Sequence, residues 1–311
     1  MRADTAEPMP RRDACVSIQP DIAALLLCEG SPVRPKWIVF SDVDGTLIDY
    51  HTYEPGPALP VLQRLEGLGV PVVFTTSKTR AEVESLRHSL GIDTPFIVEN
   101  GAAIFVPESQ FDDVPEHWER RQGYRALTLS MPYGELRAVL GSLRARFRFE
   151  SLSDMSVARL VNLTGLAERD AANALRREFG EPVLWRDSVD ALSRFTSELA
   201  ARDLAVDSGG RFLHVRAANA DKGSALKLLC AEYQNLWRSV TRVIALGDGD
   251  GDNDSSMLAA ADLAVTIPSP SPDSPSIGET PRIAADREGP EGWSRVMTAL
   301  ADLYEASVAR G

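Results

Sequence analysis

The sequence predicts an α/β fold, a doubly wound parallel sheet with an inserted α+β domain. Short β-branched apolar runs such as Trp37–Phe40 lack polar alternation, which is typical of strands buried on both faces. Leucines and valines at helical spacing lie between these runs, and alternating strands and helices favour a parallel sheet. The alternation stops near residue 111 and resumes near 216. We therefore expect 36–111 and 216–311 to form one core domain, with 112–215 inserted into it.

The first part of the chain predicts a mostly irregular extension followed by half of the sheet. Residues 1–35 contain five prolines and mixed charges, with one helical turn expected near Ile22–Leu27. Glycines end the expected helices, and Thr79 or Ser77 is the expected cap of the second one. The expected elements are a strand at 37–40, a helix at 59–68, a strand at 70–74, a helix through 83–90, and a hairpin of 96–98 with 102–106.

The hydrophobic pattern is weaker in the inserted block, 112–215, and becomes stronger again in the second part of the core, 216–311. In the block we expect strands at 124–129, 183–185 and 211–215, and helices at 136–143, 171–179 and 189–201. In the returning core we expect a helix that begins at 221–223, strands at 243–246 and 263–267, a Ser/Pro linker at 269–276, and a terminal helix after 289–293.

Composition limits the partners that the protein can have. With 33 basic and 45 acidic residues the formal charge is −12, which disfavours binding to a nucleic-acid backbone. Cys15, Cys28 and Cys230 are scattered, so we expect reduced thiols in a cytoplasmic protein rather than disulfides or a zinc site. No apolar run approaches the roughly 18 residues needed to span a bilayer, so we expect no membrane partner.

Two carboxylates lie directly after the first expected strand. Asp42 and Asp44 are two residues apart and are followed by Gly45, which permits a sharp turn at the carboxyl end of the strand. Acids this close repel each other unless a cation lies between them, so the pattern predicts a metal-assisted site. Asp42 is placed to act as a nucleophile, and Asp44 is placed to give a proton to a leaving oxygen.

Three further features could meet these carboxylates at one edge of the sheet. Thr76 ends the second strand and offers a hydroxyl to phosphate oxygens, together with the amides of the helix start after it. Lys222 adds a fixed positive charge. The acidic loop 248–254 completes an oxygen-only ligand set, which suits Mg²⁺ better than zinc or copper.

Each feature also has a purely structural interpretation. The paired acids could form a turn, Thr76 and Ser77 could cap a helix, and Lys222 could begin a solvated helix. The acidic loop could bind Ca²⁺, although it lacks the glutamate that an EF-hand has at its twelfth position. Their order along the chain, each at a strand end or helix start, favours a single catalytic site.

These motifs resemble a known superfamily. DVDGT at 42–46, the strand ending in Thr76, Lys222, and GD…ND at 247–254 are similar to haloacid dehalogenase superfamily phosphatases, and an insertion after the third strand resembles their subclass IIB cap on a Rossmann-like core. TTSKTRAEVE at 75–84, VENGAAIFVP at 98–107, SDMSVARLVNLTG at 153–165, GGRFLHV at 209–215 and GPEGW at 289–293 are similar to the mannosyl-3-phosphoglycerate phosphatase family.

The resemblance implies a role for each matching residue. It implies that Asp42 is the nucleophile and Asp44 the general acid/base, and that Thr76 and Lys222 hold the phosphate. It further implies a Mg²⁺ site and a substrate-binding set. The implied metal ligands are Asp42, Asp44 through its carbonyl, Asp248, Asn253 and Asp254; the implied substrate-binding residues are Ser77, Lys78, Arg80, Glu99 and Asn100.

The acidic loop departs from the family pattern GDxxND. Here Asp248 follows the strand directly, while Asn253 and Asp254 lie two residues too far along. Either Asp248 is the ligand and the loop is longer, or Asp250 takes its place, because 249–254 also reads GDxxND. We favour Asp248, since a strand end fixes a ligand more rigidly than the middle of a loop.

The implied reaction is Mg²⁺-dependent hydrolysis of mannosyl-3-phosphoglycerate, a small phosphorylated sugar-glycerate, to mannosylglycerate, a compatible solute, through an aspartyl phosphate. Glucosyl-3-phosphoglycerate, another sugar phosphate, and a phosphomutase reaction are alternatives within the superfamily. A non-catalytic phosphosugar-binding regulator is the alternative from another class.

Overall fold

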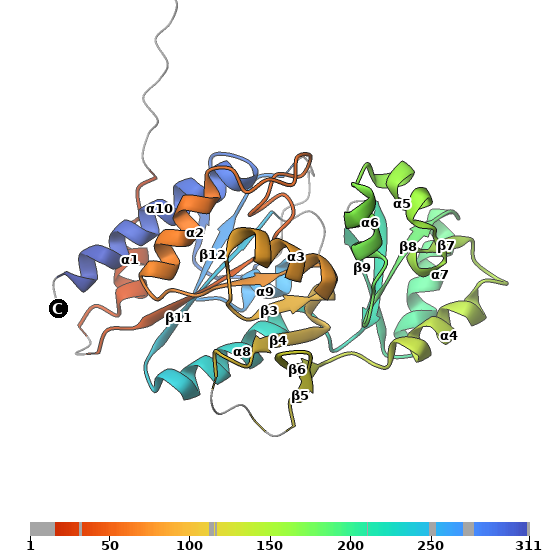
Figure 1. Cartoon of the computed structure of the whole chain (residues 1–311), viewed down its shortest axis with the longest axis horizontal. Helices are drawn as coiled ribbons and strands as arrows, with labels where there is room; N and C mark the ends of the chain where they lie inside the picture. Colours follow the sequence, from red (N-terminus) through yellow and green to blue (C-terminus); the bar gives the residue numbers. More distant parts are fainter. Residues whose placement is uncertain are drawn as a thin grey trace, which may run out of the picture.

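The structure is a computed structural model that describes residues 16–30, 33–111, 115, 117–209, 211–248, 253–269 and 277–309. Two bodies lie side by side, a core around a large sheet and a smaller unit, the cap, around a second sheet (Figure 1). Asp250 and most of the expected linker 269–276 lie outside the described residues. In the part of the chain that is described, no helix combines the length and apolar character needed to cross a membrane.

The core sheet has nine strands in the order β13-β12-β11-β1-β2-β3-β4-β6-β5. The pairings from β13 to β3 are parallel, and those from β3 through β4 and β6 to β5 are antiparallel. The predicted doubly wound fold is therefore confirmed. Its strands are β1 (Lys36–Ser41), β2 (Val72–Thr75), β3 (Phe96–Val98), β4 (Ala103–Pro107), β5 (Glu119–Arg121), β6 (Tyr124–Thr128), β11 (Thr241–Gly247), β12 (Leu263–Thr266) and β13 (Arg282–Ala284).

Helices cover both faces of this sheet, which explains why β1 is apolar throughout. Side chains alternate between the faces of a strand. Trp37 and Val39 pack in the cluster that includes α1, α2, α3 and α10, while Ile38 and Phe40 pack against α8 and α9. The core helices are α1 (Pro20–Leu27), α2 (Ala58–Gly67), α3 (Arg80–Leu90), α8 (Lys222–Trp237), α9 (Ser255–Ala259) and α10 (Gly289–Val308).

The cap has its own antiparallel sheet, in the order β7-β8-β10-β9, and its own apolar core (Figure 1). Phe195 on one of its helices packs against three other aromatic rings of that core. The cap elements are α4 (Tyr133–Leu143), β7 (Phe149–Ser151), α5 (Val157–Thr164), α6 (Glu168–Ala174), β8 (Glu181–Trp185), α7 (Val189–Ala200), β9 (Leu204–Gly209) and β10 (Phe212–Ala217).

Three elements differ from the sequence-based expectation. The strand expected at 124–129 within the inserted block is β6, which pairs with β4 and extends the core sheet. The expected helical turn at Ile22–Leu27 is an eight-residue helix whose Ile22 and Leu26 are buried, because Trp37 Nε1 donates to Leu26 O at 3.0 Å and fixes it on the core. The helix expected at 171–179 ends at Ala174. We propose, from the strand pairing, that the inserted domain begins after β6.

Candidate active site

The pairing of β1 with β11 brings two distant acids to one edge of the sheet. The two strands are parallel, with Ser41 opposite Leu246, and the amide of Asp42 donates to Leu246 O at 2.9 Å. Asp42 and Asp248 therefore both leave the sheet at its carboxyl edge, where parallel sheets bind ligands.

A glycine in the turn after β1 allows one of these acids to approach. Gly45 has φ +68°, and a Cβ atom built there would lie 2.5 Å from Asp248 Oδ2. Glycine adopts this backbone conformation without steric cost, and it also leaves room for the carboxylate. The short DVDGT segment therefore fixes the position of Asp248 as well as supplying Asp42 and Asp44.

Lys222 is the central charge of the site. It is the first residue of α8, directly after the cap residue Asp221, and its side chain is fully buried. Its Nζ lies 2.6 Å from Asp42 Oδ1 and 2.5 Å from Asp254 Oδ1. Burial alone would lower the pKa of Lys222, but the attraction of Asp254 and Asp42 outweighs it and raises the pKa. The lysine is therefore a permanent cation that bridges two buried carboxylates.

One cation does not neutralise this group of acids. Burial raises the pKa of Asp42 well above its ordinary value, with Lys222 opposing the shift and the nearby charges of Asp254 and Asp248 adding to it. Carboxylate oxygens of Asp42, Asp248 and Asp254 lie within 4.8 Å of one another. Such a group is stable in its ionised form when a second cation joins it.

The donor atoms at this place suit Mg²⁺. Among the described residues, Asp254 Oδ2 and Asn253 Oδ1 are buried without a hydrogen-bond partner, which is costly unless something binds them. Asp254 belongs to the carboxylate cluster with Asp42 and Asp248, and Asn253 lines the same pocket, so all of these donors are oxygen atoms, which magnesium prefers. The residues present therefore fit the ion that the sequence predicts.

The loop after β2 is built to present donors. Thr76 is buried, and its Oγ1 accepts from the Lys78 amide at 3.2 Å while its carbonyl accepts from the Asn100 amide at 3.0 Å. Thr79 caps α3 through a reciprocal capping box with Glu82, so of the two expected caps Thr79 takes this role. Ser77 is thus left between strand and helix, with its side chain at the pocket.

Asp44 faces Lys78 rather than the other acids. The Lys78 Nζ lies 2.8 Å from Asp44 Oδ1 and 3.8 Å from Glu82 Oε1, and 5.5 Å from the centre of the Tyr53 ring. Burial would lower the pKa of Lys78, but Asp44 and Glu82 raise it overall. Lys78 thereby holds the side chain of Asp44 at the pocket.

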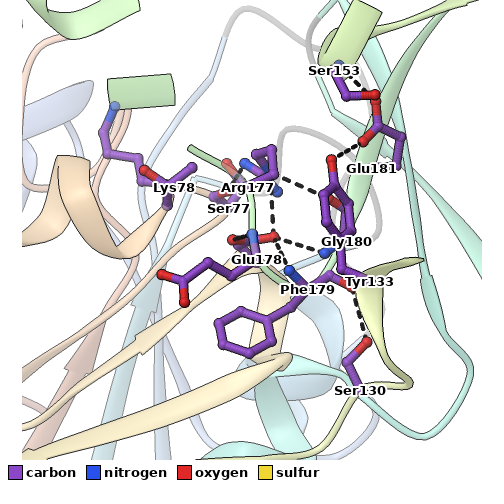
Figure 2. A network of polar contacts seen from close by, with 12 residues as sticks. Ser77, Lys78, Ser130, Tyr133, Ser153, Arg177, Glu178, Phe179, Gly180 and Glu181 are labelled. Atoms are coloured by element: carbon purple, nitrogen blue, oxygen red, sulfur yellow. Dashed lines mark hydrogen bonds and ion pairs between the residues drawn. The ribbon is translucent and has the colours of Figure 1, made fainter. Parts of the chain in front are cut away.

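A buried carboxylate joins the cap to the core. Glu99 follows β3 with φ +50°, and it accepts hydrogen bonds from the amides of Glu178, Phe179 and Gly180 at 2.9, 3.1 and 2.7 Å. Arg177 Nε lies 3.3 Å from Glu99 Oε2. We call Glu99 and residues 177–180 the clamp; residues 177–180 are labelled in Figure 2.

Other contacts surround the clamp. Arg177 Nη1 donates to Ser77 O at 2.9 Å, and Ser130 Oγ donates to Phe179 O at 2.9 Å (Figure 2). Arg80 Nε donates to Glu178 Oε1 at 2.9 Å, so the side chain of Arg80 is used in holding the cap. Glu99 is likewise committed to backbone amides of the cap, and its carboxylate is not exposed in the pocket.

The hydrogen bonds of the clamp should contribute to the stability of the protein. Glu99→Gln removes the charge that faces Arg177 and turns an amide group toward backbone donors, so we expect a loss of about 2–4 kcal/mol in the free energy of unfolding. Urea denaturation measures it. The matched control is Glu119→Gln on β5, whose side chain is 65% exposed and should change stability by less than about 0.5 kcal/mol. A loss below about 1 kcal/mol for Glu99→Gln would contradict the clamp.

Core and cap together line a pocket with a volume of about 390 Å³. Of the predicted site residues, those that line it are Asp42, Asp44, Ser77, Lys78, Asp248 and Asn253. Thr76, Lys222 and Asp254 are buried behind that wall, and Arg80 and Glu99 contact the cap. Asn100 is buried in the core, where its amide donates to Thr76 O. Four polar residues of the cap line the pocket without a role predicted from the sequence: Thr164, Arg177, Arg211 and His214.

Comparisons with known proteins identify the family of the chain. A family model described as haloacid dehalogenase-like hydrolase matches residues 39–115 and 176–273. A glucosyl-3-phosphoglycerate/mannosyl-3-phosphoglycerate phosphatase from Persephonella marina is 34% identical over 212 residues, which cover 68% of this chain and 78% of that protein.

Solved structures share the fold. A haloacid dehalogenase-like hydrolase from B. subtilis matches 85% of this chain and 99% of its own with a TM-score of 0.59 and 20% identity. A haloacid dehalogenase subclass IIB sugar phosphatase matches 85% of this chain and 99% of its own with a TM-score of 0.58 and 16% identity. The expected family and the expected class of enzyme, a phosphoric monoester hydrolase, are confirmed. The chain belongs to the haloacid dehalogenase-like hydrolases.

Proposed function

We propose that this protein is a cytoplasmic Mg²⁺-dependent phosphatase that hydrolyses mannosyl-3-phosphoglycerate to mannosylglycerate and phosphate. The buried Lys222 between Asp42 and Asp254, beside an incompletely neutralised oxygen ligand set, carries the proposal for the reaction. The relative from Persephonella marina supports the substrate class, since its name includes both the mannosyl and the glucosyl compound.

The chain's own residues divide the reaction between them. Asp42 attacks phosphorus and forms an acyl phosphate, while Lys222 holds the nucleophile and faces the charge that develops on the phosphate oxygens. Thr76 and the amides after it offer further donors. Asp44 gives a proton to the leaving oxygen and then takes one from the water that hydrolyses the acyl phosphate, with Lys78 holding its carboxylate at the pocket.

Magnesium would be held by Asp42, Asp248, Asn253 and Asp254, together with the carbonyl of Asp44, and would neutralise phosphate charge. Asp248→Ala should raise the Mg²⁺ concentration needed for half-maximal activity by at least about tenfold. The control is Asp250→Ala in the same loop, which should change it less than about threefold. The thermal shift produced by Mg²⁺ gives a second readout that needs no turnover. The opposite result would transfer the ligand role to Asp250.

Phosphate release from a substrate panel tests the proposed function. The panel contains mannosyl-3-phosphoglycerate, glucosyl-3-phosphoglycerate and common sugar phosphates, each with and without Mg²⁺. We expect fast Mg²⁺-dependent release from a glycosyl-3-phosphoglycerate. Release from the glucosyl compound alone would reassign the sugar, return of phosphate to sugar would indicate a phosphomutase, and no release at all would favour a phosphosugar-binding regulator.

A further inference from the structure

The two walls of the pocket carry opposite charge. The core wall presents Asp42, Asp44, Glu82 and Asp248, and the one lysine among its described residues, Lys78, is already paired with Asp44. The cap wall presents Arg177 and Arg211. A ligand that bridges the walls therefore meets phosphate-binding groups and metal ligands on one side and guanidinium groups on the other.

Arg177 is held in place by several contacts, but not all of its N–H donors are used in them. Its Nη1 donates to Ser77 O at 2.9 Å, and its Nε faces Glu99 Oε2 and Gly180 O, both at 3.3 Å. None of the hydrogen bonds among the described residues uses its Nη2. Glu99 also accepts three backbone amides, so its charge is shared and does not belong to Arg177 alone.

Arg211 is the less constrained member of the pair. Its Nη1 donates to Leu163 O at 2.9 Å, and within the described ranges no acidic side chain lies at ion-pair distance from its guanidinium. The residue is exposed at the start of β10, next to the pocket-lining Phe212. A charged group without an acidic partner at the rim of a pocket is available to an anionic ligand.

The rest of the cap wall is uncharged. Burial, with the nearby charges of Arg177 and Lys222, lowers the pKa of His214 to about 3, so this residue is neutral near pH 7. Its Nδ1 is buried without a partner among the described residues. Leu152, Leu160 and Phe212 complete the wall. This surface can accept a neutral, hydroxyl-bearing group, while the guanidinium groups remain its only positive charges within the described chain.

We propose that Arg177 and Arg211 form a carboxylate-binding subsite on the cap wall, which selects phosphate monoesters that carry a carboxylate on the same small molecule. The inference rests on the proposed function and deepens it by stating which residues bind the carboxylate of the glycerate. A planar guanidinium matches a carboxylate in a two-point hydrogen-bonded pair, and the phosphate itself is already bound by the core.

Equilibrium binding tests the subsite without turnover. In an Asp42→Asn background with Mg²⁺, calorimetry compares 3-phosphoglycerate with glycerol 3-phosphate, which has a hydroxymethyl group in place of the carboxylate. We expect the first to bind about 10- to 100-fold more tightly. Arg211→Gln and, separately, Arg177→Gln should reduce this ratio by about tenfold while changing the affinity for glycerol 3-phosphate less than about threefold.

Two controls separate the possible failures. Arg176→Gln removes the same charge from an exposed neighbouring position and should leave the ratio unchanged. Arg177 also contacts Ser77, so Arg177→Gln could lower the affinity for both ligands. In that case Arg211→Gln is the decisive variant. Equal affinities in the parent, or an unchanged ratio in Arg211→Gln, would overturn the subsite. Failure of the phosphate-release panel with a retained ratio would instead overturn the mannosyl substrate and leave the carboxylate subsite in place.

Discussion

Asp42→Asn should lower the rate of phosphate release by roughly 10⁴-fold or more, because an amide cannot form the acyl phosphate on which the proposed reaction depends. The effect should appear in kcat, since the substituted side chain still leaves Lys222, Thr76 and the pocket in place to bind substrate. Steady-state kinetics with Mg²⁺ and the best substrate of the panel measure it.

The same variant should remain folded. The amide side chain that replaces the carboxylate would still offer an oxygen to Lys222 Nζ, which in the parent lies 2.6 Å from Asp42 Oδ1, and removing one charge relieves repulsion from Asp254 and Asp248. Far-UV circular dichroism should therefore match the parent. The control is Asp190→Asn on the exposed part of α7, which should retain full activity. Substantial activity in Asp42→Asn would remove Asp42 from the role of nucleophile.

Lys222→Met is expected to damage both stability and catalysis. Methionine replaces the lysine at similar volume but leaves Asp42 and Asp254 buried without their shared cation, so the free energy of unfolding in EDTA should fall by about 3–5 kcal/mol. The rate of phosphate release should fall by about 10³-fold, because a fixed charge beside the reacting phosphate is lost. Urea denaturation and steady-state kinetics measure the two effects.

Magnesium should partly restore the stability of this variant. With the lysine charge removed, the three acids need another cation more strongly, so Mg²⁺ should raise the melting temperature of Lys222→Met by more than it raises that of the parent. Lys227→Met, on the exposed side of the same helix, should behave like the parent in every assay. An equal magnesium shift in Lys222→Met and the parent would show that the acids do not form one cation site.

The meeting of Asp42, Lys222 and Asp248 at one edge of the sheet was predictable because each residue follows a strong local signal. Asp42 ends a run of buried residues, Lys222 begins a helix and Asp248 ends another strand, so the topology of a parallel sheet brings them together. The loop after Asp248 could not be settled in the same way. Its repeated Gly-Asp pairs give two positions the same pattern, and the sequence contains no strand to distinguish them.

The cap side of the pocket had a weaker signal: segments 153–165 and 209–215 resembled a family, but no role followed for any of their residues. Arg177 lies 100 positions from Ser77, whose carbonyl it contacts, and it follows a helix without any motif of its own. Glu99 was assigned to substrate binding by resemblance, whereas its carboxylate accepts three amides of a segment far along the chain. Contacts of this kind arise when two domains dock, and periodicity within either domain carries no information about them.

The position of β6 was also not predictable from the sequence, for a similar reason. The apolar pattern of β6 predicts a strand correctly, but it does not say which sheet the strand joins. Likewise the prolines near α1 argued for an irregular segment, and the contact between Trp37 and Leu26 outweighs them. Local propensity is a weak guide wherever burial against another element supplies the stabilisation.

The clamp lies beside both connections between the two domains, so hydrogen bonds as well as the chain itself hold this edge of their junction. Ser130 in the first connection donates to Phe179, and β10, which leads into the second connection, pairs with β8 directly after Gly180. A rotation of the two domains about this edge would leave the hydrogen bonds of the clamp in place. Entry of substrate and release of product would then require no break in the clamp, and Arg177 would keep its position through the whole cycle.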